Sequence, residues 1–127
     1  MTSANIGAVL KFVKAWEDLD LEAIVGGFAP DAVYHNSPTD PVIGHDQIRA
    51  TIQPWIAATT EMKWILHNIA ETPSGVVFAE RTDHLVMNGA RAALRVTGVF
   101  DVKDGLITAW RDYYDEASFT KQLAPAG

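Results

Sequence analysis

The sequence has no cysteine and is short of basic residues. Without cysteine the chain has no disulfide, no thiolate metal ligand and no cysteine nucleophile, which fits the reducing cytoplasm, where we expect the protein. Lysine and arginine number 10 against 16 aspartate and glutamate residues, for a formal net charge of −6. A chain of this charge has no basic surface to balance a phosphate backbone, so we expect no nucleic-acid partner.

Several familiar motifs are missing as well. There is no G-x-S-x-G elbow, no P-loop and no G-x-G-x-x-G, which leaves a serine hydrolase, an NTPase or a Rossmann enzyme without sequence support. Residues 1–20 lack a basic stretch before an apolar run, so we expect neither a secretory signal nor a membrane span. No H-x-H or H-E-x-x-H spacing occurs, and we expect no metal site among the histidines, which are His35, His45, His67 and His84.

The composition is that of a globular protein. Hydrophobic residues make up 48% of the 127 positions and charged residues 20%. A chain of this length can bury roughly two thirds of its unfolded surface in one core. We therefore expect a single domain over residues 1–127.

The first part of the chain has a helical pattern of apolar residues. Thr2 or Ser3 can cap the first helix, and Asp20 can cap a second that Gly26 and Gly27 end. A short strand is expected at 32–36, before a turn-rich stretch. The expected helices cover 6–16, 21–25, 44–55 and, at the end of the chain, 115–123.

From residue 62 onward the pattern changes to long strands joined by short turns. The turns NGA (88–90) and KDG (103–105) have hairpin chemistry, and Asp104-Gly105 is the strongest signal among them. Helices followed by an antiparallel meander favour an α+β fold, a cone-shaped, mostly antiparallel mixed sheet wrapped around the N-terminal helices, with a pocket inside. The expected strands cover 62–71, 76–87, 91–102 and 106–114.

Polar residues interrupt the apolar faces of these strands. In ERTDHL (80–85), Arg81 and Asp83 share a face with apolar neighbours, because alternate side chains point the same way. Asp112 lies in the same manner among large aromatic residues, and Tyr34 and Asn36 are two apart on the short strand. On the strand between them, an apolar face that could line the same cavity comprises Ala92, Leu94, Val96 and Gly98.

Buried charges must be paired, and two carboxylates sharing a site push one pKa upward. Arg81 between Asp83 and Asp112 could keep one acid ionised and the other protonated, as general acid and base catalysis requires. The same three residues could instead form a structural network that only fixes the sheet. The residues alone leave both alternatives open.

Three segments resemble the limonene-1,2-epoxide hydrolase family, which has the cone-shaped fold of nuclear transport factor 2-like and SnoaL-like proteins. They are YHN at 34–36, ERTDHL at 80–85 and WRDYYD at 110–115, which match the family's Tyr-x-Asn, Arg-x-Asp and Trp-Arg-Asp in order and spacing. The likeness extends from the first helix to Phe119.

The resemblance implies a role for each polar residue. Asp112 would take a proton from water that Tyr34 and Asn36 hold, Asp83 would protonate the epoxide oxygen, and Arg81 would bridge the two acids. Neither a covalent intermediate nor a cofactor is implied.

The resemblance also implies an apolar terpene or cycloalkene epoxide as the substrate, with water as the second reactant. A homodimer through the open sheet face is implied as well, and exposed strand edges make such an assembly physically reasonable. Trp55 and Trp64 are bulkier than we expect in such a pocket. The residues expected to bind the substrate are Leu85, Leu94, Val96, Phe119, Trp55 and Trp64.

Two rival functions use the same fold. A ketosteroid-isomerase-like enzyme would use an aspartate base and an oxyanion hole, but needs no arginine joining two aspartates. A small-molecule binding domain without enzymatic activity is the other rival, since a fold alone does not give a function.

Overall fold

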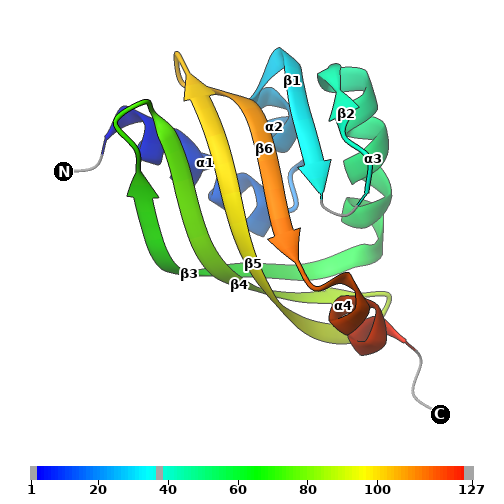
Figure 1. Ribbon diagram of the computed structural model, residues 1–127. Helices are drawn as coiled ribbons and strands as arrows, with labels where there is room; N and C mark the ends of the chain where they lie inside the picture. Colours follow the sequence, from blue (N-terminus) through cyan, green and yellow to red (C-terminus); the bar gives the residue numbers. More distant parts are fainter. Residues whose placement is uncertain (1–2, 37–38, 125–127) are drawn as a thin grey trace.

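The computed structural model of the protein describes residues 3–36 and 39–124. Three of the four helices precede residue 59, and four long strands follow one another from that residue onward, so the expected α+β class is confirmed. Figure 1 shows the chain coloured from one end to the other. The elements are α1 (Ala4–Glu17), α2 (Leu21–Gly26), β1 (Phe28–Asn36), β2 (Val42–Ile43), α3 (Gly44–Ala58), β3 (Thr59–Glu71), β4 (Val76–Met87), β5 (Ala90–Lys103), β6 (Leu106–Tyr114) and α4 (Glu116–Leu123).

The strands form one six-stranded sheet in the order β2-β1-β6-β5-β4-β3. β1 and β6 run parallel, whereas the other neighbours are antiparallel, so the expected mixed sheet is confirmed. Figure 1 shows the sheet curving in front of α1 and α2, with α3 beside β1 and β2 and with α4 at the end of β6. The concave side of the sheet therefore faces the N-terminal helices.

Side-chain caps fix where three helices begin. Ser3 accepts a hydrogen bond from the backbone N–H of Ile6 and starts α1. Asp20 and Asp115 do the same for α2 and α4, and Gly27 ends α2 as expected. Thr2, the alternative cap, lies outside the described residues, as do positions 37–38 of the turn-rich stretch.

Two hairpin turns have the backbone that their sequences predict. Asn88 and Gly89 both have positive φ angles, 50° and 80°, and so do Asp104 and Gly105, at 52° and 79°. Two successive positive φ angles define the turn type whose twist matches a hairpin. These turns set the registers of β4 with β5 and of β5 with β6.

The structure corrects the beginning of the sheet. β1 starts at Phe28, four residues before the expected strand, and contains Pro30. Proline interrupts a strand pattern because it cannot donate to the ladder. The pairing of β1 with β6 shifts register between Phe28 and Val33, and this irregularity accommodates Pro30. The short strand β2, which pairs with β1, was not predicted either.

The core is an aromatic cluster between α1 and the sheet. Trp110 of β6 is 1% exposed and lies at its centre. Its ring stacks on Phe100 and Tyr34, with centroid distances of 5.6 and 4.6 Å, and Phe12 of α1 meets it edge-on at 5.0 Å. Because Trp110 is two residues before Asp112, this packing fixes the strand that carries the candidate base. Among the described residues, no helix is long and apolar enough to cross a membrane.

Candidate active site

The sheet registers bring the predicted polar residues together on its concave side. Asp112 of β6 lies opposite Gly98 of β5. Arg81 and Asp83 belong to β4, the strand that pairs with the other edge of β5. The three charged residues are buried, with exposed fractions of 1% for Arg81, 6% for Asp83 and 5% for Asp112. Among the described residues they are the charged side chains that are buried, and the hydroxyl of Thr59 is the other buried polar group outside the aromatic residues.

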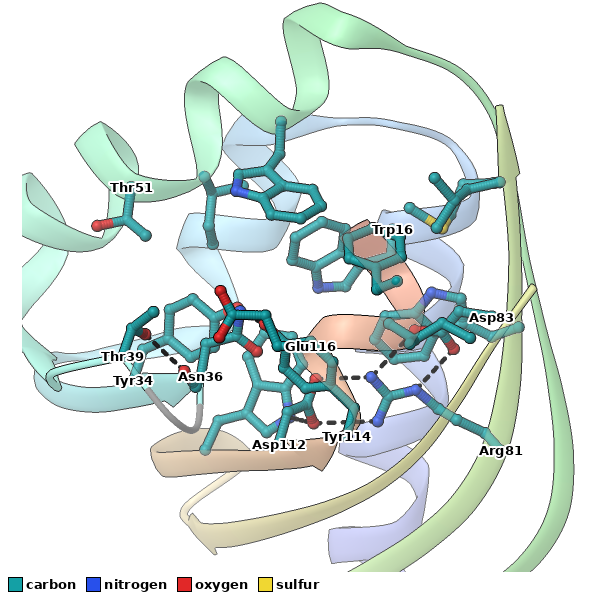
Figure 2. A pocket seen from close by; sticks show the side chains of 18 of the residues that line it. Trp16, Tyr34, Asn36, Thr39, Thr51, Arg81, Asp83, Asp112, Tyr114 and Glu116 are labelled. Carbon is teal, nitrogen blue, oxygen red and sulfur yellow. Dashed lines mark hydrogen bonds and ion pairs between the residues drawn. The ribbon is translucent and has the colours of Figure 1, made fainter. Parts of the chain in front are cut away.

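Arg81 bridges the two acids, as the sequence predicted. Its Nε and Nη2 donate to the two oxygens of Asp83 at 2.8 and 3.2 Å. Its Nη1 and Nη2 donate to the two oxygens of Asp112 at 3.1 and 2.7 Å. Figure 2 shows the guanidinium group between the two carboxylates. Both contacts are bidentate, the arrangement in which an arginine fixes a carboxylate most firmly.

Two tryptophans hold this triad in place. The guanidinium carbon of Arg81 lies 3.9 Å from the centroid of the Trp64 ring, close enough for a cation–π interaction. The indole Nε1 of Trp110 donates to Oδ1 of Asp112 at 2.7 Å. Asp112 therefore receives three N–H donors, two from Arg81 and one from Trp110.

The parallel pair β1 and β6 adds the two uncharged polar residues. Tyr34 lies beside Trp110 in the register and Asn36 beside Asp112. Tyr34 is 8% exposed, and its ring stacks on Trp110. Asn36 Nδ2 donates to the hydroxyl of Tyr114 at 3.1 Å. The predicted tyrosine and asparagine thus face the same cavity as Asp112.

The environment separates the protonation behaviour of the groups. Burial raises the pKa of Asp83, Arg81 lowers it, and the charge of Asp112 raises it again, so that the pKa is raised overall to about 6. Burial also raises the pKa of Tyr34 well above its usual value, so its hydroxyl stays neutral. Burial lowers the pKa of Arg81, but the charges of Asp112 and Asp83 outweigh it and raise the pKa overall.

These groups form one wall of a cavity of about 390 Å³. Its other walls are mainly apolar and come from α1, α3, β3, β4, β5 and α4. Five of the six residues that the sequence suggested for substrate binding line it, namely Trp55, Trp64, Leu85, Leu94 and Phe119.

Val96, the sixth, is not among the described residues that line the cavity. It is 3% exposed, and it pairs with Arg81 on one side and with Tyr114 on the other. Both partners have larger side chains that reach the cavity. The lining position expected for Val96 is therefore taken by its neighbours.

Other residues that line the cavity were not predicted from the sequence. Trp16 of α1 lines the cavity as well as the core, and Met62 of β3 lies beside the predicted apolar residues. Tyr114 and Glu116 lie at the junction of β6 and α4. Tyr114 could have been suspected, because it shares a strand face with Asp112, whereas Glu116 follows the strand and gave no periodic signal.

Such an arrangement of two acids and an arginine is suited to proton transfer. One carboxylate with three N–H donors and a second with a raised pKa can accept and donate a proton at two points of one cavity. Within residues 3–36 and 39–124 there is no group of three histidine, aspartate or glutamate side chains placed to hold a metal ion.

Comparison with known proteins gives consistent results. The model of the limonene-1,2-epoxide hydrolase catalytic domain matches residues 3–125. The epoxide hydrolase EphG of Mycobacterium tuberculosis (strain ATCC 25618 / H37Rv) is 32% identical over 121 residues, which cover 91% of this chain and 76% of that protein.

Solved structures agree in fold. The structure of an LEH-like epoxide hydrolase from M. tuberculosis superimposes with a TM-score of 0.82 at 30% identity, over 96% of this chain and 90% of that one. A nuclear transport factor 2-like protein of unknown function from Burkholderia pseudomallei K96243 gives 0.86 at 20% identity, over 98% and 100% of the two chains, which supports the fold alone. A SnoaL-like protein from Shewanella denitrificans OS-217 also gives 0.86, at 17% identity and over 96% and 98% of the chains. With a domain match over nearly its whole length, the chain belongs to the limonene-1,2-epoxide hydrolase family.

Proposed function

We propose that the protein is an epoxide hydrolase that adds water to an apolar epoxide in one step and releases a vicinal diol. Family membership and the 32% identity with an epoxide hydrolase support this class of reaction. The observation that carries the proposal is the bidentate bridge of Arg81 to both Asp83 and Asp112 at the wall of an apolar cavity.

In this proposal Asp112 is the base. A water molecule held by Tyr34 and Asn36 gives one proton to Asp112 while its oxygen attacks an epoxide carbon. The bond between that carbon and the epoxide oxygen breaks, and Asp83 donates its proton to this oxygen. Asp112 makes the water more nucleophilic, and Asp83 neutralises the negative charge that develops on the epoxide oxygen. Because both effects act in the same step, both lower its activation barrier.

Arg81 has two effects in this scheme. It orients Asp112 through two hydrogen bonds, and it holds Asp83 in a fixed orientation without preventing its protonation, since the pKa of Asp83 rises to about 6. The two acids and the water account for every proton that moves. The reaction as proposed therefore needs neither a covalent enzyme intermediate nor a cofactor.

The cavity favours a hydrocarbon substrate. Leu85, Leu94 and Phe119 present apolar side chains to the space in front of the acids, and Trp55 stacks on Phe119 with ring centroids 5.5 Å apart. A terpene or cycloalkene epoxide has one oxygen for Asp83 and an apolar body for these walls. We propose this substrate class for the protein.

We also propose a homodimer that forms through the outer face of the sheet. Ile65 of β3 and Phe78 of β4 are 36% and 42% exposed on the side opposite the cavity. Burying such side chains against a second copy would remove them from water. Light scattering coupled to size-exclusion chromatography measures the mass, and a monomer at micromolar concentration would contradict this part of the proposal.

A substrate panel tests the proposed reaction against its rivals. The purified protein is incubated with limonene oxide, cyclohexene oxide, a linear epoxide and a Δ5-ketosteroid, and diol formation and isomerisation are followed separately. The proposal expects diols and no isomerisation. Isomerisation alone would favour the ketosteroid-isomerase-like function, and binding without turnover of any compound would favour a non-enzymatic binding domain.

A further inference from the structure

The hydrogen bond between Asn36 and Tyr114 is a feature that the roles described so far do not use. Asn36 Nδ2 is the donor and the Tyr114 hydroxyl oxygen the acceptor, at 3.1 Å (Figure 2). The two residues lie 78 positions apart in sequence. They meet because Asn36 ends β1 beside Asp112, and Tyr114 follows Asp112 by two residues on the same face of β6.

The orientation of the Asn36 amide determines what it offers to a water molecule. An asparagine side chain has an oxygen that accepts and a nitrogen that donates, and a half-turn exchanges the two. With Nδ2 committed to Tyr114, the carbonyl oxygen remains for another partner. Among the described residues, no donor is hydrogen-bonded to this oxygen.

A nucleophilic water molecule beside Asp112 requires a particular set of hydrogen-bond partners. It must give one hydrogen to Asp112 and place the other on a second acceptor, so that a lone pair stays free to attack carbon. The carbonyl oxygen of Asn36 is such an acceptor. If the amide were reversed, its N–H group would donate to the water instead and compete for the lone pair needed for attack.

We propose that Tyr114 is a positioning residue that holds the Asn36 amide with its carbonyl oxygen toward the nucleophilic water. This inference rests on the proposed function. Tyr114 is suited to the role because its ring is fixed edge-on against Phe119, with centroids 6.3 Å apart. Burial, followed by the charge of Glu116, raises the pKa of Tyr114, so the hydroxyl stays neutral.

A double-mutant cycle on turnover tests the inference. Tyr114→Phe removes only the hydroxyl, and we expect kcat to fall roughly 3–10-fold, the effect of one lost neutral hydrogen bond, with KM changed by less than about twofold. In the Asn36→Ala background the same substitution should change kcat by less than about 1.5-fold, because the amide it acts through is gone. Tyr113→Phe, an equal change on the exposed outer face, is the control and should keep wild-type kcat.

The possible outcomes distinguish a failure of the role proposed for Tyr114 from a failure of the proposed epoxide hydrolase function. An active wild type whose Tyr114→Phe variant keeps full kcat overturns the inference alone. The inference also fails if Tyr114→Phe loses the same factor with and without Asn36, since a purely structural role would be additive. A wild type that hydrolyses no epoxide in the panel overturns the proposed function, and the inference with it.

Discussion

Gly98 lies directly opposite Asp112 in the β5–β6 ladder, and its lack of a side chain makes room for the acidic pair and its arginine. A Cβ atom at this position would lie 2.8 Å from Oδ1 of Asp112 and 2.6 Å from Nη1 of Arg81. Real Cβ atoms are almost never that close to other heavy atoms, so both groups, or the strand itself, would have to move.

Gly98→Ala should therefore impair turnover without unfolding the protein. A displacement near 1 Å at the reacting groups can cost about 100-fold in rate, and we expect a fall of that order in kcat/KM. Gly7→Ala is the control, since a Cβ there meets nothing within 4 Å and alanine is the better helix former. Wild-type turnover in Gly98→Ala would mean that the close approach has no role.

Arg81→Ala should be the most destabilising change at the site. It leaves two buried carboxylates facing each other without a cation, and breaking a buried pair in this way costs roughly 3–5 kcal/mol. Arg111→Ala is a matched control, because its pair with Asp101 is partly exposed and should contribute about 0–1 kcal/mol. Urea unfolding measures both. A loss at Arg81 no greater than at Arg111 would contradict the burial argument.

The pH dependence follows from the raised pKa of Asp83. Between the usual carboxyl pKa of about 4 and the value of about 6 in the folded protein, Asp83 holds a proton that the unfolded chain has lost. Its contribution to the free energy of unfolding is therefore full below this window and declines as the pH rises through it.

The pH dependence of the reaction rate should also report the titration of Asp83. If Asp83 must be protonated to act as the acid, kcat/KM should decline above about pH 6, and this decline should disappear from the residual activity of Asp83→Asn. Rate profiles of both proteins between about pH 5 and 9 measure it. A wild-type profile that is flat over this range would exclude Asp83 as the required acid.

Much of this site could be predicted because its signals are local. Alternation within ERTDHL was enough to place Arg81 and Asp83 on one face. The Asp104-Gly105 turn indicated the β5–β6 hairpin, whose second strand contains Asp112. The bond between Asn36 and Tyr114 and the contact at Gly98 depend instead on registers between strands distant in sequence. Pairing of that kind leaves no periodic trace in a single chain.

The same limit explains the errors. The first strand was expected at 32–36 but starts at Phe28, because an irregular pairing with β6 accommodates Pro30. Val96 has the right periodicity for the cavity, but the sizes of its cross-strand partners, Arg81 and Tyr114, decide which side chains reach the open space.

Isotope labelling tests whether hydrolysis takes one step. In a single turnover in heavy-oxygen water, the label should appear in the diol and the protein should stay unlabelled, because the water attacks the epoxide directly. An ester intermediate would instead place the label in an aspartate during hydrolysis of the ester. Mass spectrometry of the peptides containing Asp83 and Asp112 distinguishes the two, and label in either peptide would exclude the one-step reaction.

The turnover of Asp112→Asn on a tertiary and a secondary epoxide tests the central claim most directly. Asparagine keeps the shape of the side chain but cannot take a proton from water, so the fold should persist while hydrolysis falls by roughly 10²–10⁴-fold or more. Asp101→Asn, in the partly exposed pair with Arg111, is the matched control and should retain its activity. A folded Asp112→Asn protein, judged by its melting temperature, with turnover near that of the wild type would contradict the assignment of Asp112 as the base.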